Sequence, residues 1–322
     1  MTETGQSPEP KGQVSDAVRG NWVDHLAPDW TRPYLRLSRA DRPIGTWLLL
    51  LPCWWGLFLS AAQQGRFGWD GLWIMVGSGA GAWLMRGAGC TWNDITDRHF
   101  DGQVERTKSR PIPSGQVSAK QAAVWMVLQS LAALLILLTF NKNAILLGFV
   151  SLVPVAIYPF AKRFTYWPQV FLGIAFNWGA LLAWTAQSGS LGWPAVLLYL
   201  AGLSWTLFYD TIYAHQDKED DVMIGVKSTA LLFGKDTPKW MLRFLVITVL
   251  LMLTAILIAL IGASPIALIV AIGAPWALGW HLVWQLRKLD IDDGDGLLML
   301  FRANRNAGLL PVLFFAAAVI LN

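Results

Sequence analysis

Nine long apolar runs separated by short polar stretches fill most of the chain after residue 42. Each run is long enough, or nearly so, to cross the ~30 Å hydrocarbon core of a bilayer as an α-helix. We therefore expect an all-α, polytopic transmembrane helical bundle of nine spans. The expected spans are 43–62, 71–91, 119–140, 144–161, 167–188, 193–213, 240–262, 264–286 and 307–321. The last run is the shortest and has polar flanks.

Basic residues fall on alternate loops between these runs. With the N-terminus inside, one side holds Arg32 to Arg42, Arg98 to Lys120, Lys162 and Arg163, Lys218 to Arg243, and Arg287 to Arg305. The opposite loops hold only Arg66 and Lys142. Since Lys and Arg are retained on the cytoplasmic side of a membrane, this asymmetry supports the count of spans and predicts a cytoplasmic N-terminus.

The composition agrees with a membrane protein. Hydrophobic residues make up 55% of the 322 residues and charged residues only 14%, which argues against an ordinary soluble domain. The net charge of +4 is distributed among the loops, and no basic tract with interleaved aromatic residues suggests nucleic acid as a partner. Both cysteines, Cys53 and Cys90, lie inside apolar runs, so we expect buried thiols without a disulfide.

The first 30 residues differ from the rest because they are polar. Acidic residues interrupt any apolar run there, which argues against a signal peptide and against an organelle transit peptide. We expect residues 1–30 to form a flexible cytoplasmic tail and residues 31–322 to form one transmembrane domain. These observations predict a multi-pass protein of a bacterial inner membrane.

An acidic face ends the second apolar run. Asp94, Asp97 and Asp101 are spaced i, i+3, i+7, so they share one face of a helix, with Asn93 one turn before Asp97. Like charges so placed repel each other unless a cation holds them together. Oxygen ligands of this kind suit Mg²⁺, which takes one or two carboxylates and completes its shell with water and substrate phosphate.

Cations follow this first acidic face. Arg106, Lys108 and Arg110 come within nine residues of Asp101 and would suit the same anion as the metal. We select Arg110 as the residue that binds this anion, with Lys108 as a further candidate.

A second acidic face ends the sixth apolar run. Asp210, Asp217 and Asp221 are seven and four residues apart, so a helix would again place them on one side. Lys227 follows in a short turn that contains glycine and is the candidate cation for an anionic substrate there. Two acidic faces imply two metal positions or one shared cluster. Their equivalent positions are compatible with two four-helix pseudo-repeats plus one helix, although only the acidic faces support such a repeat.

Not every polar residue requires a functional explanation. A single aspartate near a helix end is usually a solvated loop residue, as we expect for Asp290, Asp292, Asp293 and Asp295, whereas ionisable groups at membrane depth are costly and usually functional. His99 and His215 lack the spacing of a zinc site, so we expect a supporting or surface role for both. Tyr209 and Tyr213, one turn apart beside Asp210, either line a site or pack in the core.

The two acidic runs resemble the signatures of the UbiA family of intramembrane prenyltransferases. Asn93-Asp94-x-x-Asp97-x-x-x-Asp101 is similar to the first signature, and Asp217-x-x-x-Asp221 is similar to the second. Three runs resemble the branch that acts on 4-hydroxybenzoate. They are DRPIGTWLLLLP from Asp41, SRPIPSG from Ser109 and YDTIYAHQDKEDD from Tyr209.

The resemblance implies a helical bundle open to lipid that binds a Mg²⁺-bound polyprenyl diphosphate between the two motifs. It implies an enzyme that transfers the polyprenyl group to the ring carbon ortho to the hydroxyl of 4-hydroxybenzoate, an early step toward ubiquinone. Metal and basic side chains would stabilise the leaving diphosphate, and a pocket shielded from water would protect the allylic cation. The implied metal ligands are Asp94, Asp97, Asp101, Asp217 and Asp221, with Asp210 a further catalytic carboxylate. Asn93 and Tyr213 are implied to contact substrate.

An aromatic acid entering from the cytoplasm needs a fixed cation for its carboxylate. Arg42, at the start of the first span, has the bidentate fork for this role, and Arg39, one turn earlier, is the second choice. Both could equally be ordinary positive-inside anchors, since this stretch is basic throughout.

Other functions stay open on sequence grounds. Within the family the acceptor could be homogentisate, a naphthoate or haem. An ion-coupled transporter also uses intramembrane carboxylates, but it does not obviously need two acidic clusters with adjoining Lys and Arg. A scaffold protein needs neither. The sequence does not specify the chain length of the prenyl group, the group that removes the ring proton or the oligomeric state.

Overall fold

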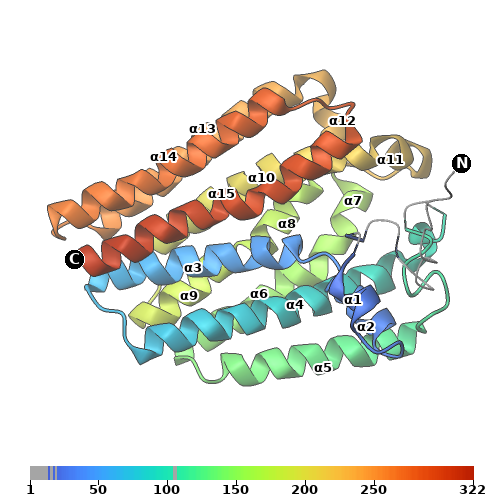
Figure 1. Cartoon of the computed structure of the whole chain (residues 1–322), viewed down its shortest axis with the longest axis horizontal. Helices are drawn as coiled ribbons and strands as arrows, with labels where there is room; N and C mark the ends of the chain where they lie inside the picture. Colours follow the sequence, from blue (N-terminus) through green and yellow to red (C-terminus); the bar gives the residue numbers. More distant parts are fainter. Residues whose placement is uncertain (1–13, 15–16, 19, 104–106) are drawn as a thin grey trace, which may run out of the picture. The chain divides into compact units, whose positions relative to one another are not determined.

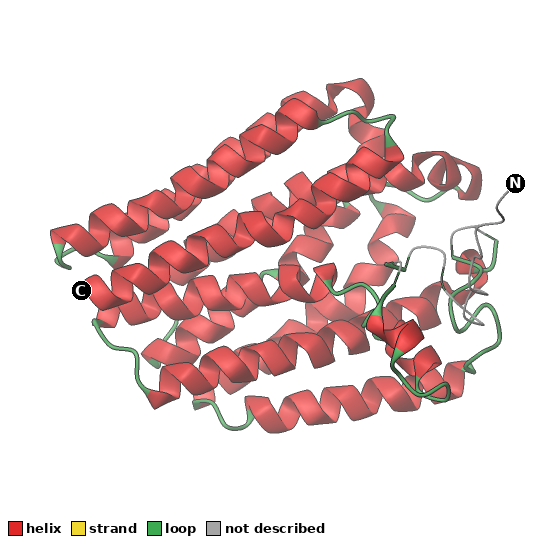
Figure 2. Cartoon of the chain, viewed as in Figure 1, coloured by secondary structure: helices red, strands yellow, loops and turns green. Residues whose placement is uncertain are grey.

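The computed structural model describes residues 14, 17–18, 20–103 and 107–322, and every element in these ranges is a helix or a turn (Figure 2). Eight helices are long and apolar enough to cross a membrane. The second expected span is also helical but is not among these eight. The prediction of an all-α, multi-span bundle is thus confirmed, with nine long helical segments where nine runs were expected.

The chain divides into two compact units, which are described separately. Unit 1 consists of residues 1–45 and 83–133, and unit 2 of residues 46–82 and 134–322. The division falls inside α3, α4 and α5, so each part of these helices is described with its own unit. Figure 1 labels the helices along the chain.

Unit 1 contains two short helices and parts of three long ones. They are α1 (Trp22–His25), α2 (Arg32–Leu37), the start of α3 (Ile44–Gln64), the second half of α4 (Trp69–Asp101) and most of α5 (Ala119–Leu137). Its apolar core is centred on Leu37, Val117 and Ala122, against which Tyr34 and Trp125 pack. In the part of the predicted tail that is described, Val23 and Asp24 are buried. Most of the rest of that tail, residues 1–13, 15–16 and 19, lies outside the described residues, and the boundary at residue 30 stays a prediction.

Unit 2 contains the remaining helices. After α3 and the start of α4 come α6 (Lys142–Ile157), η1 (Tyr158–Phe160), α7 (Ala161–Phe164), α8 (Pro168–Phe176), α9 (Trp178–Ser188), α10 (Trp193–Ala214), η2 (His215–Asp217), α11 (Lys218–Ile224), α12 (Thr229–Phe233), η3 (Gly234–Asp236), α13 (Thr237–Ala259), α14 (Pro265–Lys288) and α15 (Gly294–Leu321). Helix α10 packs against α8, α9, α13 and α15, and α14 packs between α13 and α15. The long helices α13, α14 and α15 run side by side in Figure 1.

Two expected spans differ from their helices. The run 307–321 is the end of the 28-residue α15, which begins at Gly294, so the last span is long instead of marginal. The run 167–188 is interrupted at Asn177, where α8 ends and α9 begins. The side chain of Asn177 donates to the Thr206 hydroxyl of α10 at 2.8 Å, so the amide at this interruption has a partner inside the unit.

The close approach of α3 to α9 in unit 2 requires a small residue at position 56. A Cβ atom added at Gly56 would overlap the carbonyl of Ala180 on α9.

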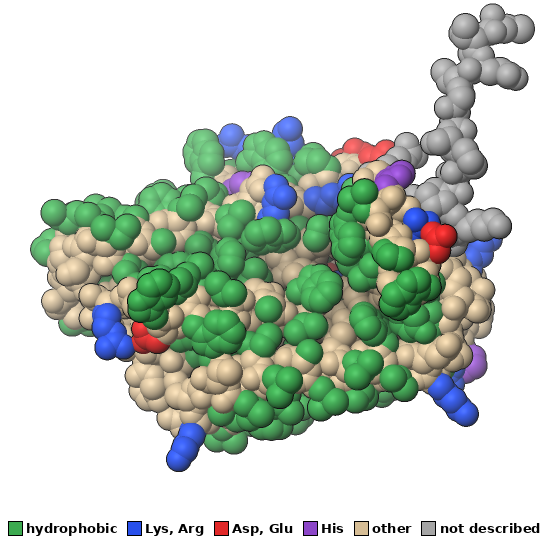
Figure 3. Space-filling view, turned by 60° about the horizontal axis from the view of Figure 1, so that its bottom comes forward, with side chains coloured by type: hydrophobic (Ala, Val, Ile, Leu, Met, Phe, Trp, Pro, Cys, Tyr) green, Lys and Arg blue, Asp and Glu red, His purple; other side chains and the backbone are tan. Residues whose placement is uncertain are grey.

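Large apolar side chains are exposed on several helices, including Leu131 and Leu135 of α5 and Trp276 and Trp280 of α14. Figure 3 shows hydrophobic side chains over much of one face and Lys and Arg toward its margins. Such a surface is what a lipid-facing protein requires.

Candidate active site

The first acidic face lies on the last turns of α4, as the spacing predicted. Helix α4 ends at Asp101, and Asp94, Asp97 and Asp101 are 0%, 0% and 6% exposed. Asn93 is half-buried beside them. Three buried carboxylates on one helical face are costly unless positive charge accompanies them, so their neighbours determine what the site can do.

Arg39 provides the first positive charge. Its Nη1 donates to Asp94 Oδ2 at 2.9 Å and its Nη2 to Asp94 Oδ1 at 2.6 Å, a bidentate pair with both side chains buried. Burial alone would lower the pKa of Arg39, but the adjacent Asp94 carboxylate outweighs this effect and raises it. Burial alone would raise the pKa of Asp94, yet the charges of Arg39 and Arg110 bring it below its usual value. Both partners are therefore ionised.

Arg110 provides the second positive charge from the turn that follows α4. Its Nη1 donates to Asp101 Oδ2 at 2.9 Å and lies 3.4 Å from Asp94 Oδ1. The turn is fixed by Thr107, whose hydroxyl donates to the carbonyl of Asp101 at 2.8 Å. Lys108 is exposed, and Arg106 lies outside the described residues. The predicted cations thus include one, Arg110, that contacts the first acidic face.

The donor set of this face fits Mg²⁺ in its chemistry. Among the residues that the structure describes, no three His, Cys, Asp or Glu side chains are grouped closely enough to hold a metal ion. Mg²⁺ does not require three, because one or two carboxylates with water and phosphate are its usual ligands in proteins. Both oxygens of Asp94 accept from Arg39, whereas Arg110 donates to one oxygen of Asp101, so we take Asp97 and Asp101 as the first candidates for direct metal ligands.

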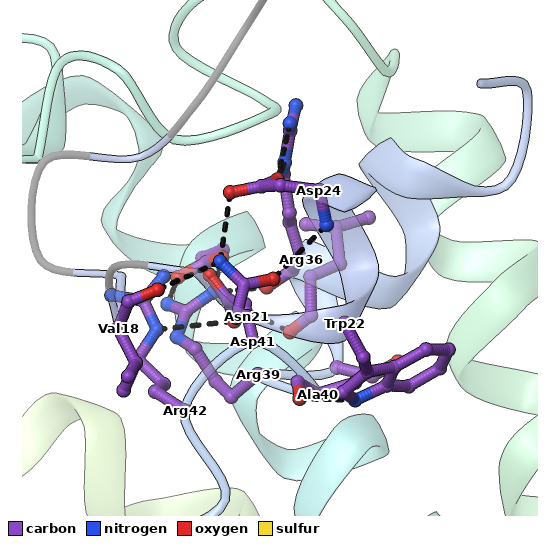
Figure 4. Close-up of polar contacts among 12 residues, drawn as sticks. Val18, Asn21, Trp22, Asp24, Arg36, Arg39, Ala40, Asp41 and Arg42 are labelled. Carbon is purple, nitrogen blue, oxygen red and sulfur yellow. Dashed lines mark hydrogen bonds and ion pairs between the residues drawn. The ribbon is translucent and has the colours of Figure 1, made fainter. Parts of the chain in front are cut away.

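The assignment of Arg39 to the acceptor's carboxylate needs correction. Its guanidinium fork is used by Asp94, so this group is not available for the acceptor in the described arrangement. Arg42, which is labelled in Figure 4, has its Nε 3.3 Å from Asp41 Oδ1. Burial raises the pKa of Asp41 to about 6, since its side chain is wholly inaccessible to solvent. Arg42 remains the candidate for the acceptor.

The second acidic face, in unit 2, is not one continuous α-helix. Asp210 lies in the last turn of α10, Asp217 ends the 3₁₀ turn η2, and Asp221 lies in α11. All three are half-buried. The predicted single helical face is therefore broken between Asp210 and Asp217, where the helix tightens, while Asp217 and Asp221 are one turn apart across the start of α11. Gly225, with φ of 71°, ends α11 and turns the chain toward Lys227.

Neighbouring side chains in unit 2 differ in their roles. Tyr209 is 1% exposed and packs between Trp205 and Phe301, so it is a core residue. Tyr213 is half-buried with its ring 4.4 Å from that of Phe301. Lys227 lies with Nζ 5.3 Å from the centre of the Tyr166 ring. Outside unit 2, the predicted supporting or surface residue His99 is exposed near the end of α4 in unit 1.

His215 is buried, which excludes the surface role that we considered for it. Its Nε2 lies 2.9 Å from the hydroxyl of Thr237, at the first residue of α13. The ring thus connects the turn after α10 to the start of α13.

Three charged side chains of unit 1 that are buried or half-buried were not recognised as such from the sequence. Arg86 lies within an apolar stretch of α4 close to the start of α3, where a Cβ added at Gly45 would be 2.6 Å from its Nη2. A lone arginine inside an apolar run was a readable signal. Asp24 and Arg36 form a buried ion pair that no local pattern announces, because its partners are twelve residues apart and one lies in the predicted tail.

Comparison with known proteins supports the interpretation of these motifs. The model of the UbiA prenyltransferase family matches residues 49–304. The chain is 50% identical over 291 residues to the mitochondrial 4-hydroxybenzoate polyprenyltransferase of Rattus norvegicus, covering 89% of this chain and 75% of that protein. It is 47% identical over 309 residues to the mitochondrial enzyme of the same name in Homo sapiens, covering 95% and 80%.

Solved structures support the fold. A UbiA homologue from Aeropyrum pernix K1 in its apo form superposes with a TM-score of 0.66 at 23% identity, covering 85% of this chain and 96% of that one. A UbiA homologue from Archaeoglobus fulgidus bound to DMAPP and Mg²⁺ gives a TM-score of 0.64 at 20% identity, covering 89% and 99%. At these identities the likeness shows the shared helical fold.

The predicted location in a bacterial inner membrane is wrong. The similar proteins from rat and human carry the word mitochondrial in their names, which points to a mitochondrial membrane. The assignment of the N-terminus and the site to a bacterial cytoplasm is withdrawn with it. The acidic residues of the first 30 positions misled the prediction, because they were taken to exclude an organelle. The multi-pass membrane character is unaffected.

Proposed function

The chain belongs to the UbiA prenyltransferase family, and from this premise we propose that it transfers a polyprenyl group from polyprenyl diphosphate to 4-hydroxybenzoate. It is an aromatic prenyltransferase of a membrane. The bond between the allylic carbon and the diphosphate oxygen breaks, a bond forms to the ring carbon ortho to the hydroxyl, and that carbon loses its proton. The products are the prenylated acid, diphosphate and a proton.

One observation supports this proposal most directly. Asp94, Asp97 and Asp101 form a buried acidic face with two arginines bound to it, in a chain that is half identical to enzymes named for this reaction. An ion-coupled transporter also uses intramembrane carboxylates, but carboxylates combined with fixed guanidinium groups are what the recognition of a metal-bound diphosphate uses.

We assign Mg²⁺ as the metal cofactor, with Asp97 and Asp101 as its first candidates in unit 1 and Asp217 and Asp221 in unit 2. Bound Mg²⁺ would neutralise charge on the leaving diphosphate. Asp94 holds Arg39 and Arg110 in place, and Arg110 and Lys227 would bind diphosphate oxygens directly. Lys108 is exposed and can meet an incoming anion. Asn93, Asp210 and Tyr213 would contact the substrate.

Arg42 would hold the carboxylate of 4-hydroxybenzoate. Its guanidinium can form two parallel hydrogen bonds to a carboxylate, which orients the ring as well as binding it. Asp41 would help to hold Arg42 in place, since its Oδ1 lies 3.3 Å from Arg42 Nε.

The test is an assay of the purified protein in lipid with labelled prenyl diphosphate, Mg²⁺ and a panel of acceptors. We expect prenylated product with 4-hydroxybenzoate and no product, or far less, with homogentisate, a naphthoate or haem. Product with another acceptor alone would move the chain to a different branch of the family. No product with any acceptor, while ion flux is seen in vesicles, would favour a transporter instead.

A further inference from the structure

Arg39 has an unusual backbone conformation. Its φ is 57°, and within the described part of the chain no other residue except glycine has a positive φ. A residue other than glycine is disfavoured in this left-handed region, so surrounding contacts must hold the backbone of Arg39 there. The residue so held is the one whose fork binds Asp94.

A buried ion pair lies directly beside this residue. Arg36 donates through Nε at 3.2 Å and Nη2 at 2.7 Å to Asp24 Oδ1, and the two side chains are 2% and 1% exposed. Asn21 completes the partners of Asp24, donating from Nδ2 to Asp24 Oδ2 at 2.8 Å and accepting from the Asp24 backbone N–H at 3.1 Å. Figure 4 shows these side chains next to Arg39.

The ion pair is connected to Arg39 by hydrogen bonds. Arg39 Nη1 donates to the carbonyl of Arg36 at 3.1 Å, and the Arg39 backbone N–H donates to the same carbonyl at 3.0 Å. One carbonyl thus fixes both the turn and the guanidinium of Arg39. The position of that carbonyl depends on Arg36, which is held in turn by Asp24.

The other side of the turn is held by α5. The Ser38 hydroxyl donates to Gln129 Oε1 at 3.0 Å and accepts from Trp125 Nε1 at 2.9 Å. A Cβ added at Gly87 would meet both Gln129 and Ser38, so the turn lies against α4 at this position. Gly87 and Asp94 are seven residues apart and share a face of α4. The turn therefore runs along the face that carries the first carboxylate.

We propose that Asp24 and Arg36 are positioning residues that set the guanidinium of Arg39 on Asp94 and thereby shape the diphosphate end of the active site. The inference rests on the proposed function, since it assigns a catalytic consequence to this cluster. A buried ion pair is a poor means of stabilising a fold, because desolvation offsets much of the attraction. The pair is instead explained by the position that it gives to the guanidinium of Arg39, which the reaction needs.

The first experiment compares Michaelis constants for Asp24→Asn, Asp24→Glu and the control Asp29→Asn. Asp29 lies in the same segment and pairs with Arg32, but its side chain is 89% exposed. We expect Asp24→Asn to raise KM for prenyl diphosphate about tenfold, as is typical of residues that support a ligand, and to leave KM for 4-hydroxybenzoate nearly unchanged. Asp24→Glu should recover much of the loss, and Asp29→Asn should match wild type. Equal changes in both constants, or a loss confined to kcat, would overturn the proposal.

The second experiment asks whether Asp24 acts through Arg39. Arg39→Lys removes the bidentate fork, so in Arg39→Lys the further change Asp24→Asn should add less than about twofold to KM for the prenyl donor. If the two changes raise KM for the prenyl donor by factors that multiply in the double variant, Asp24 acts independently of Arg39 and the proposal is overturned.

A third measurement does not depend on turnover. Mg²⁺ with inorganic diphosphate should raise Tm of the wild-type protein in detergent, and this rise should be smaller in Asp24→Asn but unchanged in Asp29→Asn. An equal rise in all three proteins would overturn the positioning role. Wild-type activity with 4-hydroxybenzoate separates this outcome from failure of the proposed function, because an inactive wild type that still responds to Mg²⁺ and diphosphate would reject only the function.

Discussion

Individual residues of unit 1 show why buried carboxylates can be kept ionised in a membrane protein. Asp94 accepts from Arg39 through both oxygens, and Arg110 adds a second cation at Asp101. Arg39 and Arg110 thus bring two positive charges to a face of three carboxylates, which reduces the repulsion within it. A bound metal ion would add further positive charge to this face, and Asp97 is the carboxylate for which we test this role.

Asp97→Asn tests that inference. We expect kcat/KM to fall by about 100-fold or more, because the amide keeps the shape but loses the charge that a divalent ion requires. Asp70→Asn on the first turn of the same helix is the control, since its carboxylate is exposed and pairs with Arg66 at the surface. Wild-type turnover in Asp97→Asn would remove this residue from the metal site.

Arg42→Lys tests the assignment of the acceptor's carboxylate. Lysine retains the charge but not the fork, so KM for 4-hydroxybenzoate should rise about tenfold while KM for the prenyl donor changes little. Arg39→Lys should show the opposite preference because its partner is Asp94. If both variants keep the acceptor constant of wild type, the carboxylate is held by another cation.

The buried carboxyl of Asp41 should make the free energy of unfolding depend on pH. Burial raises its pKa from 3.8 to about 6 in the folded state, in spite of Arg39 and Arg36 nearby. The folded protein then binds more protons than the unfolded chain between these values, so the free energy of unfolding falls as pH rises from about 4 to 6. Above pH 6 the cost is fully present and amounts to at most about 3 kcal/mol.

Asp41→Asn removes this titration. The variant should therefore be more stable than wild type at pH 7.5, and the difference in Tm should disappear toward pH 4. Thermal unfolding in detergent over this range measures it. A constant difference at all pH values would show that Asp41 keeps its ordinary pKa in the folded protein.

At the scale of helices, the sequence predicted most long elements well and their interruptions poorly. Apolar runs identify spans because only helices satisfy the backbone in lipid. They cannot show that α8 ends at Asn177, that η2 tightens the helix before Asp217, or that α15 begins as early as Gly294. These features depend on contacts with distant partners.

The candidate site shows the same limit. The i, i+3, i+7 spacing located Asp94, Asp97 and Asp101 on one face, because a helical period is local information. It could not show that Arg39 lies on Asp94, since this contact joins residues 55 apart and depends on a left-handed turn. Arg36 and Asp24 were missed for the same reason.

Helix packing gives a prediction for α3. Gly56→Val should lower the free energy of unfolding by roughly 1–3 kcal/mol, because its side chain would overlap the backbone of Ala180 on α9. Gly79→Ala on α4 is the matched control, because nothing lies within 4 Å of an added Cβ there. It should be neutral or slightly stabilising. Equal Tm values for Gly56→Val and wild type would show that α3 and α9 can separate.

At the scale of the whole chain, the charge pattern of the loops predicts sidedness. Lys142 precedes α6 and Lys235 precedes α13, and both are exposed. Three spans lie between the two loops, so they should be on opposite sides of the membrane. A membrane-impermeant maleimide applied to sealed vesicles should label only one of Lys142→Cys and Lys235→Cys. The native Cys53 and Cys90 are buried and should give little background. Labelling of both from the same side would require a different number of spans.

The amide of Asn177 has a consequence for how the protein is made. Its nitrogen donates to the carbonyl of Gly173 in its own segment at 2.8 Å and to the Thr206 hydroxyl, 29 residues later in the chain, at 2.8 Å. A polar group left without its hydrogen bonds in hydrocarbon is costly. The segment 168–188 leaves the ribosome before that hydroxyl exists. At that stage the amide can make only the local bond to Gly173, and the second bond forms when α10 packs against the segment, so the arrival of α10 is expected to fix the interrupted span in its final position.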